Sequence, residues 1–159
     1  MKIELKSIKT YERLSEETTC FTANLYVDGK LLAHVENSGK GGNTGYSLVK
    51  LIDKTKLRSV EDYCKTLPDV VYDTFTFKSD LEYVIDDLLE KHLLEKDQKK
   101  MNKNMEKGLI YGNVNSYSII TWKNHTIATL LATPAGKTLL TKKVDELKSK
   151  GINVLNTNL

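Results

Sequence analysis

The stretch TTCFTANLYVDGKLLAHVENSGKGGNTGY, residues 18–46, carries the clearest structural pattern in the 159-residue chain. Apolar and polar residues alternate on both sides of Asp28-Gly29, which is typical of two antiparallel strands joined by a tight turn. A glycine-rich loop, NSGKGGNTGYS (37–47), follows the second strand. The stretch therefore predicts a β-hairpin that leads an antiparallel sheet.

The register of this hairpin depends on the length of its turn. A two-residue Asp28-Gly29 turn mixes apolar and polar faces, because a slip of one residue moves every side chain to the other side. A three-residue loop, 27–29, places Gly29 in a left-handed bulge position. It also unites the apolar face by pairing Leu25 with Leu31, Ala23 with Ala33 and Phe21 with Val35. We therefore predict the three-residue loop, and a pairing of Val27 with Lys30 would contradict it.

The best helix signal begins at Ser79. Ser79 and Glu82 match the S-x-x-E capping box, and apolar residues then recur at helical spacing to residue 95. Beyond it, residues 95–108 are polar and lysine-rich, which predicts a protruding or fraying end closed near Gly108. A second helix is predicted from Thr133 and Pro134, which suit the N-cap and first helical positions, to Gly151.

The remaining segments give shorter predicted elements. Residues 2–9 form a strand with a bend near Ser7, and residues 47–53 form either a strand or a helical turn. A short helix covers 59–67 with Ser59 as its cap, and 69–77 form a strand. Residues 109–132 form further sheet with turns at Gly112-Asn113 and Lys123-Asn124, and 152–155 form a final strand.

These elements predict a single α+β domain over residues 1–159. An antiparallel sheet led by the N-terminal hairpin is covered by a long amphipathic helix, and a C-terminal strand–helix–strand segment follows. A division into lobes near residues 96–108 is the alternative.

The composition is that of an ordinary globular chain with a modest positive charge. The net charge is +3 and the pI is about 8.7, which permits an anionic partner without requiring one. Arg13 and Arg58 are the only arginines. No signal-peptide pattern and no apolar run of membrane-spanning length is present. We expect a soluble protein without membrane contact, located in the cytoplasm, or made in the cytoplasm of a host.

Motifs for catalysis or metal binding do not emerge from the sequence. His34, His92 and His125 lack metal-ligand spacing, and Cys20 and Cys64 lack C-x-x-C spacing. Asp86-Asp87 are adjacent on a helix and therefore point apart. The sequence predicts a non-enzyme with no catalytic residue, no metal site and no cofactor.

The glycine-rich loop is the first candidate contact site. Glycines allow left-handed backbone angles and bring N–H groups close to a ligand, so the loop suits an anion. A phosphate-loop interpretation fails because Tyr46 stands where that motif requires lysine. The alternative is a connector without a ligand. The candidate ligand- or partner-binding residues are Asn37, Gly39, Lys40, Gly41, Gly42, Asn43 and Tyr46.

A lysine stripe offers a second candidate site, for nucleic acid. It repeats at helical spacing of three and four and consists of Lys96, Lys99, Lys100, Lys103 and Lys107. Such a stripe can lie along a phosphate backbone. The alternative is a solvated helix end, since no arginine or interleaved aromatic residue accompanies it.

Residues 14–46 resemble the N-terminal part of small uncharacterised proteins from phages and prophages. The matching positions are Ser15, Glu16, Glu17, Thr18, Cys20, Phe21, Ala23, Leu25, Tyr26, Gly29, Lys30, Val35, Asn37, Gly39, Gly41 and Gly42. The resemblance implies a mobile-element origin, with roles such as host takeover or counter-defence, and it covers about a fifth of the chain.

The sequence as a whole favours a non-enzymatic, phage-type binding protein. Its expected partner is a host protein or a nucleotide-like anionic ligand. Nucleic-acid binding through the lysine-rich end of the 79–107 helix is the alternative.

Overall fold

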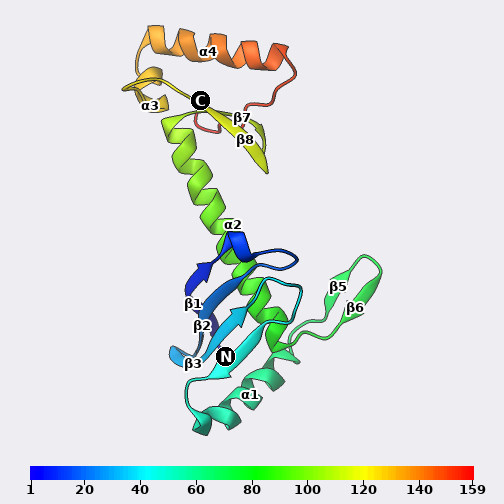
Figure 1. Ribbon diagram of the computed structural model, residues 1–159. Helices are drawn as coiled ribbons and strands as arrows, with labels where there is room; N and C mark the ends of the chain where they lie inside the picture. Colours follow the sequence, from blue (N-terminus) through cyan, green and yellow to red (C-terminus); the bar gives the residue numbers. More distant parts are fainter. The chain divides into compact units, whose positions relative to one another are not determined.

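The computed structural model describes all 159 residues apart from the side chain of Tyr72, and it has an α+β fold (Figure 1). Contacts divide the chain into a first unit, Met1–Leu93, and a second unit, Leu94–Leu159. The strands are β1 (Ile3–Thr10), β2 (Phe21–Val27), β3 (Lys30–Asn37), β4 (Gly45–Leu48), β5 (Val70–Tyr72), β6 (Phe75–Phe77), β7 (Gly108–Asn113) and β8 (Ser116–Thr121). The helices are η1 (Glu12–Leu14), η2 (Leu51–Asp53), α1 (Lys54–Cys64), α2 (Leu81–Lys107), α3 (Ile127–Leu131) and α4 (Pro134–Ser149).

The predicted antiparallel sheet led by the hairpin is confirmed. Its four strands lie in the order β1-β2-β3-β4, and each neighbouring pair is antiparallel. The bend predicted near Ser7 is also present, because the β1–β2 register shifts between Lys6 and Lys9 and Ser7 has a φ of 54°. The predicted ambiguity at 47–53 resolves into the end of β4 followed by the 3₁₀ helix η2.

The predicted three-residue hairpin loop is wrong. Val27 pairs with Lys30, so the turn consists of Asp28 and Gly29 alone. Both turn residues have positive φ, 49° and 79°, as a type I′ turn requires. Asp28 is further held by the backbone of Lys2, which donates its N–H to Asp28 Oδ1 at 2.9 Å.

A β-bulge removes the mixing of faces that this short turn would otherwise cause. Tyr26 pairs with Leu31 but Leu25 pairs with Ala33, so Leu32 is an extra residue on β3. Leu32 and Ala33 are consequently both buried. The apolar face is united as the sequence predicts, through a bulge inside the strand instead of through the turn.

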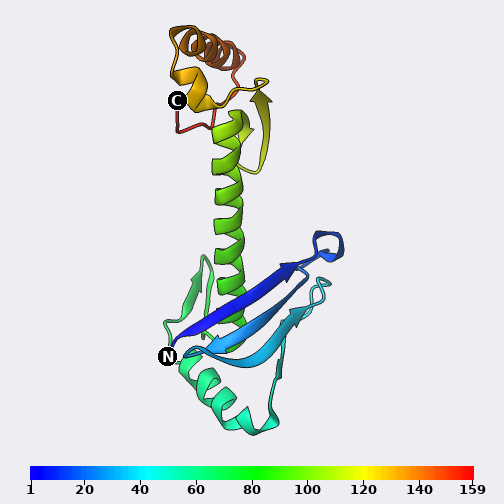
Figure 2. The same cartoon turned by 90° about the vertical axis from the view of Figure 1, so that its left-hand side faces the viewer.

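The core of the first unit lies between the sheet and two helices. Buried residues of β2 and β3 pack with Val60 and Cys64 of α1 and with Leu81, Ile85 and Leu89 of α2. Figure 2 shows the strands of the sheet beside the N-terminal half of α2. The prediction that the long amphipathic helix covers the sheet is therefore confirmed.

The two predicted helix starts in this unit are displaced. Asp80 caps α2, since its Oδ1 accepts the N–H of Tyr83 at 2.8 Å, whereas the predicted capping residue Ser79 is buried. The helix α1 begins at Lys54, five residues before the predicted cap. Ser59 lies inside the helix and donates its hydroxyl to Thr55 O, a bond that interior serines commonly make.

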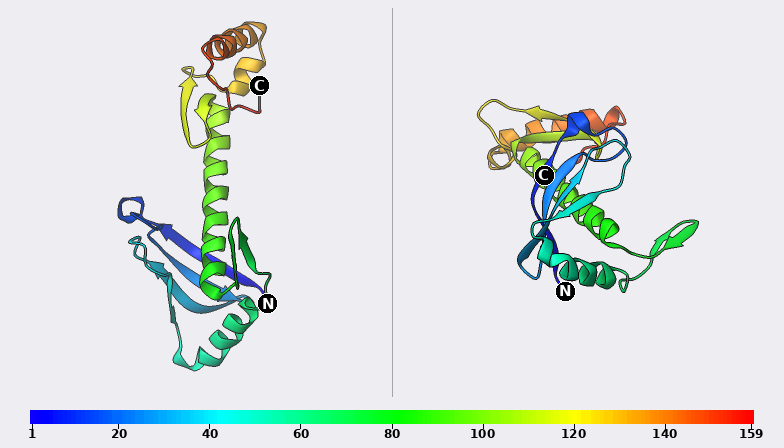
Figure 3. Two further views of the ribbon diagram at one scale, coloured as in Figure 1. Left: turned by 90° about the vertical axis from the view of Figure 1, so that its right-hand side faces the viewer. Right: turned by 60° about the horizontal axis from the view of Figure 1, so that its bottom comes forward.

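Residues 69–77 form a small hairpin instead of the single predicted strand. The strands β5 and β6 pair antiparallel, and they belong to a two-stranded sheet of their own. Figures 1 and 3 show this hairpin extending away from the four-stranded sheet.

The second unit contains the β7–β8 hairpin and the helices α3 and α4. The segment 127–131, predicted as sheet, is helical because Thr126 and Thr129 form a reciprocal capping box. Helix α4 starts as predicted, with Thr133 Oγ1 accepting the N–H of Gly136 at 3.1 Å and proline at the first helical position. The predicted strand 152–155 reduces to an isolated bridge between Val154 and Tyr111.

Candidate functional site

The glycine-rich loop is fixed to the connection between β1 and β2 through Gly39. Its carbonyl oxygen accepts three successive backbone N–H groups, from Glu16, Glu17 and Thr18, at 2.9, 3.0 and 3.3 Å. Gly39 has a φ of +84°, and a Cβ there would lie 2.3 Å from the carbonyl oxygen of Leu14. Only glycine fits this position without rearrangement.

Asn37 organises the loop from inside. Its Oδ1 accepts hydrogen bonds from Thr18 Oγ1 at 2.9 Å and from the Gly39 N–H at 2.8 Å. Its Nδ2 donates to Gly42 O at 3.0 Å and to Thr44 Oγ1 at 3.2 Å. The residue is only 7% exposed, so the amide uses its hydrogen-bonding capacity on the loop itself.

Thr44 attaches the end of the loop to α2. Its backbone N–H donates to Glu82 Oε1 at 2.7 Å, and its hydroxyl donates to Asp86 Oδ1 at 2.8 Å. Thr44 is 4% exposed. These two charge-assisted hydrogen bonds are of the stronger kind, and they set the position of the loop against the helix.

A pocket of about 500 Å³ lies between the loop and α2. We call it the loop pocket. Its polar wall includes Asn43 and Thr44 from the loop, and its apolar wall includes Phe21, Leu89 and Leu93. Three carboxylates spaced four residues apart on α2 complete the lining: Glu82, Asp86 and Glu90.

The electrostatics of the loop pocket are negative. Burial raises the pKa of the Asp86 carboxyl, the Thr44 hydrogen bond lowers it, and the nearby charges of Glu82 and Asp80 raise it further. Burial is the largest cause of the raised pKa, and the neighbouring carboxylates add negative charge to the same site. The pocket therefore favours a cationic or hydrogen-bond-donating group over an anion.

The structure separates the loop residues predicted for ligand contact into two groups. Lys40, Gly41, Gly42 and Asn43 are exposed on the loop, and Gly42 and Asn43 line the loop pocket. Asn37 also lines the pocket, while Gly39 is buried.

Tyr46 lies on β4 and is not part of the lining of the loop pocket. Its hydroxyl donates to Glu61 Oε1 at 2.8 Å, which connects the sheet to α1. Partial burial and the Glu61 hydrogen bond raise the pKa of Tyr46 to about 12. Tyr46 is thus engaged in packing β4 against the helix.

The predicted lysine stripe lies on the surface of α2 in the second unit. All five of its members are exposed: Lys96, Lys99, Lys100, Lys103 and Lys107. Lys99 forms an ion pair with Glu95 at 3.8 Å, and both side chains are so exposed that the pair contributes little. The second unit contains eleven lysines and five acidic residues, hence +6, whereas the first unit, with thirteen basic and sixteen acidic residues, carries −3.

Among the described residues, no group of three or more His, Cys, Asp or Glu side chains is arranged so that it could hold a metal ion. Cys20 and Cys64 are free and buried. Burial raises the pKa of the Cys64 thiol to about 11, which leaves it protonated at neutral pH. In the part of the chain that the structure describes, no helix has the length and apolar character needed to cross a membrane.

The chain matches no protein-family model, no curated protein and no solved structure. The resemblance of residues 14–46 to phage and prophage proteins therefore stays a prediction.

The acidic wall of the loop pocket was missed at the sequence level. The spacing of Glu82, Asp86 and Glu90 was readable as one face of a helix. What the pattern lacked was any indication that the glycine-rich loop, about forty residues earlier in the chain, lies against that face.

Proposed function

We propose that the chain is a non-enzymatic binding protein that engages a partner protein at the loop pocket. The observation that carries this proposal is the acidic wall of Glu82, Asp86 and Glu90 beside the exposed loop residues Gly42 and Asn43. A lysine or arginine side chain of the partner fits such a pocket, because its charge meets the carboxylates and its methylene stem meets Phe21 and the leucines.

A protein partner is favoured over a nucleotide-like anion, the other expectation from the sequence. Three of the loop N–H groups that could cradle a phosphate are already occupied, and those of Gly39 and Thr44 donate to Asn37 Oδ1 and Glu82 Oε1. That of Gly41 donates to Thr18 Oγ1 at 3.3 Å. The carboxylates that line the loop pocket would also repel a negatively charged ligand.

The resemblance to phage and prophage proteins directs the choice of partner. On that basis the partner is a protein of a host cell, contacted during takeover of the host or in countering its defences. The proposal places the encounter in the host cytoplasm.

The test uses the full chain with an affinity tag and a host-cell lysate, followed by binding measurements on each captured protein. Glu90→Lys reverses one charge in the pocket wall without touching the Thr44 hydrogen bonds. Glu36→Lys, on an exposed position of β3, makes the same charge change elsewhere and serves as the control. We expect Glu90→Lys to weaken binding at least about tenfold and Glu36→Lys to leave it unchanged.

Two results would contradict the proposal. A nucleotide that raises the melting temperature of the wild-type chain, and loses this effect in a Gly41→Ala variant, would make the loop an anion site. Equal binding by wild type and Glu90→Lys would place the contact outside the loop pocket.

A second candidate function is nucleic-acid binding by the second unit, favoured by its charge of +6 and by the exposed lysine stripe. DNA retention should fall steeply with salt, with a log–log slope of about −0.9 for each phosphate contacted. Replacing Lys99, Lys100 and Lys103 with glutamine should reduce that slope. The control replaces Lys40, Lys65 and Lys78 of the first unit, which changes the net charge equally. If DNA retention falls equally in both variants, binding depends only on the net charge of the chain, which would contradict a dedicated binding face on α2.

A further inference from the structure

Two aliphatic side chains stand exposed where the sheet passes into α1. Leu51 and Ile52, both in η2, are 78% and 86% exposed, the highest values among the large apolar side chains that the structure describes. Isolated exposed aliphatics are common on protein surfaces. Two adjacent exposed aliphatic side chains beside a hollow lined by apolar residues enlarge the contiguous apolar surface, and large surfaces of that kind mark interaction sites.

Such a hollow lies beside Ile52. A pocket of about 750 Å³, here called the hairpin-tip pocket, is lined by the end of the β2–β3 hairpin and by the segment 50–56. Val27, Leu31 and Leu32 supply its apolar floor, and Ile52 contributes to its lining. Leu31 faces it from the bulged part of β3, where the strand runs beyond its pairing with β4.

The charges that line this pocket are unequally satisfied. Asp28 already accepts the Lys2 N–H at 2.9 Å and the Lys56 ammonium at 3.3 Å, and these bonds hold the pKa of its carboxyl below the usual value. Lys30 and Lys50 line the same pocket, and neither forms an ion pair with a described residue. Asp53 is the one other acidic residue in the lining. The available charge at the pocket is therefore positive.

We propose that the hairpin-tip pocket, with Leu51 and Ile52, is a docking site for a partner-protein segment that combines apolar and acidic side chains. An apolar anchor of the segment fills the pocket against Leu31 and Ile52. Its carboxylates pair with Lys30 and Lys50 at the edge. This surface is separate from the loop pocket and has the opposite charge preference, so the inference goes beyond the function proposed above.

The pocket chemistry favours a protein segment over nucleic acid or an anionic membrane. No arginine and no aromatic residue lines the pocket, so bidentate phosphate contacts and base stacking both lack their usual groups. A lipid surface would be met by protruding apolar groups alone, whereas here Ile52 borders a concave site that suits one inserted side chain.

The experiment is a selection of short random peptides displayed against the immobilised full chain. We expect the enriched peptides to combine Asp or Glu with aliphatic or aromatic residues. In solution, Ile52→Ser should weaken binding of the best synthetic peptide at least about tenfold, because its apolar contact is lost. Lys50→Glu should weaken it by a similar factor through repulsion.

Matched controls separate this surface from general effects. Val71→Ser removes an aliphatic side chain that is 75% exposed on β5, and Lys65→Glu reverses a charge near the end of α1. Both controls should leave peptide binding unchanged. Ile52 is so exposed that its replacement should preserve the fold, which the melting temperature checks.

Three outcomes would overturn the inference. Enrichment of basic peptides, or of none, contradicts the stated partner chemistry. Equal binding by wild type and Ile52→Ser places the contact elsewhere. The third outcome is that no acidic peptide binds, while the chain sediments with phosphatidylserine vesicles or is retained on duplex DNA. If Ile52→Ser abolishes that sedimentation or retention, the surface belongs to a different class of partner.

Discussion

Thr44 Oγ1 donates a 2.8 Å hydrogen bond to Asp86 Oδ1 and accepts one from Asn37 Nδ2 at 3.2 Å. This hydroxyl therefore connects the interior of the glycine-rich loop to α2. We expect Thr44→Val to lower the free energy of unfolding by about 1–3 kcal/mol, because two polar groups lose their partner. Chemical denaturation measures the change. Thr44→Ser keeps the hydroxyl and should cost less than half as much; equal losses would show that packing of the methyl group dominates.

Asp86 should make stability depend on pH in the acidic range. Burial against the loop raises the pKa of its carboxyl above the ordinary 3.8. The folded state then holds a proton that the unfolded state has released, so stability falls as the pH rises through this interval and is constant above the folded-state pKa. Asp86→Asn keeps an acceptor for the Thr44 hydroxyl but does not titrate, so its stability should not fall in this pH interval. Its stability relative to wild type, from denaturation at successive pH values, should increase from about pH 4 upward; a constant difference would contradict the assignment.

Gly39 and Gly42 test how much of the loop is fixed by backbone geometry. Alanine at position 39 would combine a positive φ with a 2.3 Å approach of its Cβ to Leu14 O, and we expect a loss of at least about 2 kcal/mol in unfolding free energy. Alanine at position 42 meets nothing within 4 Å and should change stability by less than about 0.5 kcal/mol. Thermal or chemical unfolding distinguishes the two, and similar losses would show that the loop conformation is not set at Gly39.

The fold follows from the sequence where local chemistry and burial agree. The alternation around Asp28-Gly29, the apolar spacing after residue 80 and the Thr133-Pro134 helix start each combine a pattern with a terminal signal. The hairpin register did not follow. Asp-Gly favours a two-residue turn, whereas, with regular pairing along the strands, uniting the apolar side chains on one face requires a three-residue loop. The bulge at Leu32 allows the short turn and still keeps the apolar face together.

The remaining prediction errors fall on short segments whose sequence suits a strand and a helix equally well. The segment HTIATLLAT, residues 125–133, suits a strand by composition, and the Thr126–Thr129 capping pair makes five of its residues helical. The candidate site was predicted in part: the loop was identified, but its acidic wall comes from α2. Local patterns contain no information on which helix face meets a loop that is distant in the chain.

Tyr46 should show its hydrogen bond to Glu61 in an alkaline titration. Burial and Glu61 raise its pKa from 10.0 to about 12, so the folded state keeps the phenol proton after the unfolded state has lost it. Stability should therefore fall as the pH rises from about 10 to about 12. The chain has eight tyrosines, and the difference in phenolate absorbance between wild type and Tyr46→Phe isolates this one. A difference curve centred near pH 10 would contradict the contact. At neutral pH, Tyr46→Phe should cost about 1 kcal/mol.

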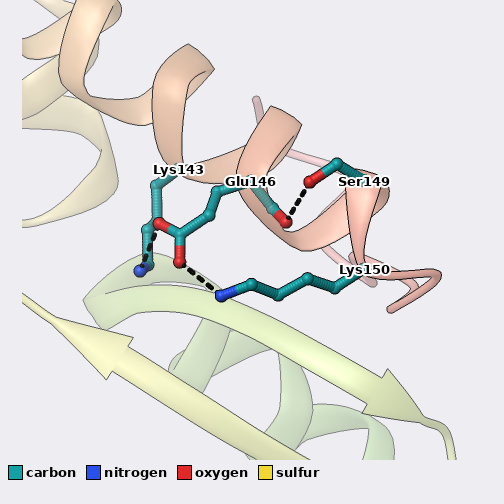
Figure 4. Close-up of polar contacts among 4 residues, drawn as sticks. All are labelled: Lys143, Glu146, Ser149 and Lys150. Atoms are coloured by element: carbon teal, nitrogen blue, oxygen red, sulfur yellow. Dashed lines mark hydrogen bonds and ion pairs between the residues drawn. The ribbon is translucent and has the colours of Figure 1, made fainter.

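Glu146 on α4 is held between two lysines, which Figure 4 shows. Lys143 Nζ and Lys150 Nζ donate to its carboxylate oxygens at 2.7 and 2.9 Å, and they lower its pKa from 4.5 to about 2. The stabilisation is therefore present above pH 4.5 and is lost as the pH falls toward 2.

Carboxyl NMR titration should report this low pKa directly, and Lys143→Gln should move it back toward 4.5. Lys142→Gln removes the neighbouring charge, which forms no ion pair with the described residues, and should have a much smaller effect. Because the group is exposed, added salt should also raise the pKa in the wild type. A Glu146 pKa that stays near 4.5 in the wild type, or that moves equally in both variants, would show that the two lysines do not hold the carboxylate in solution.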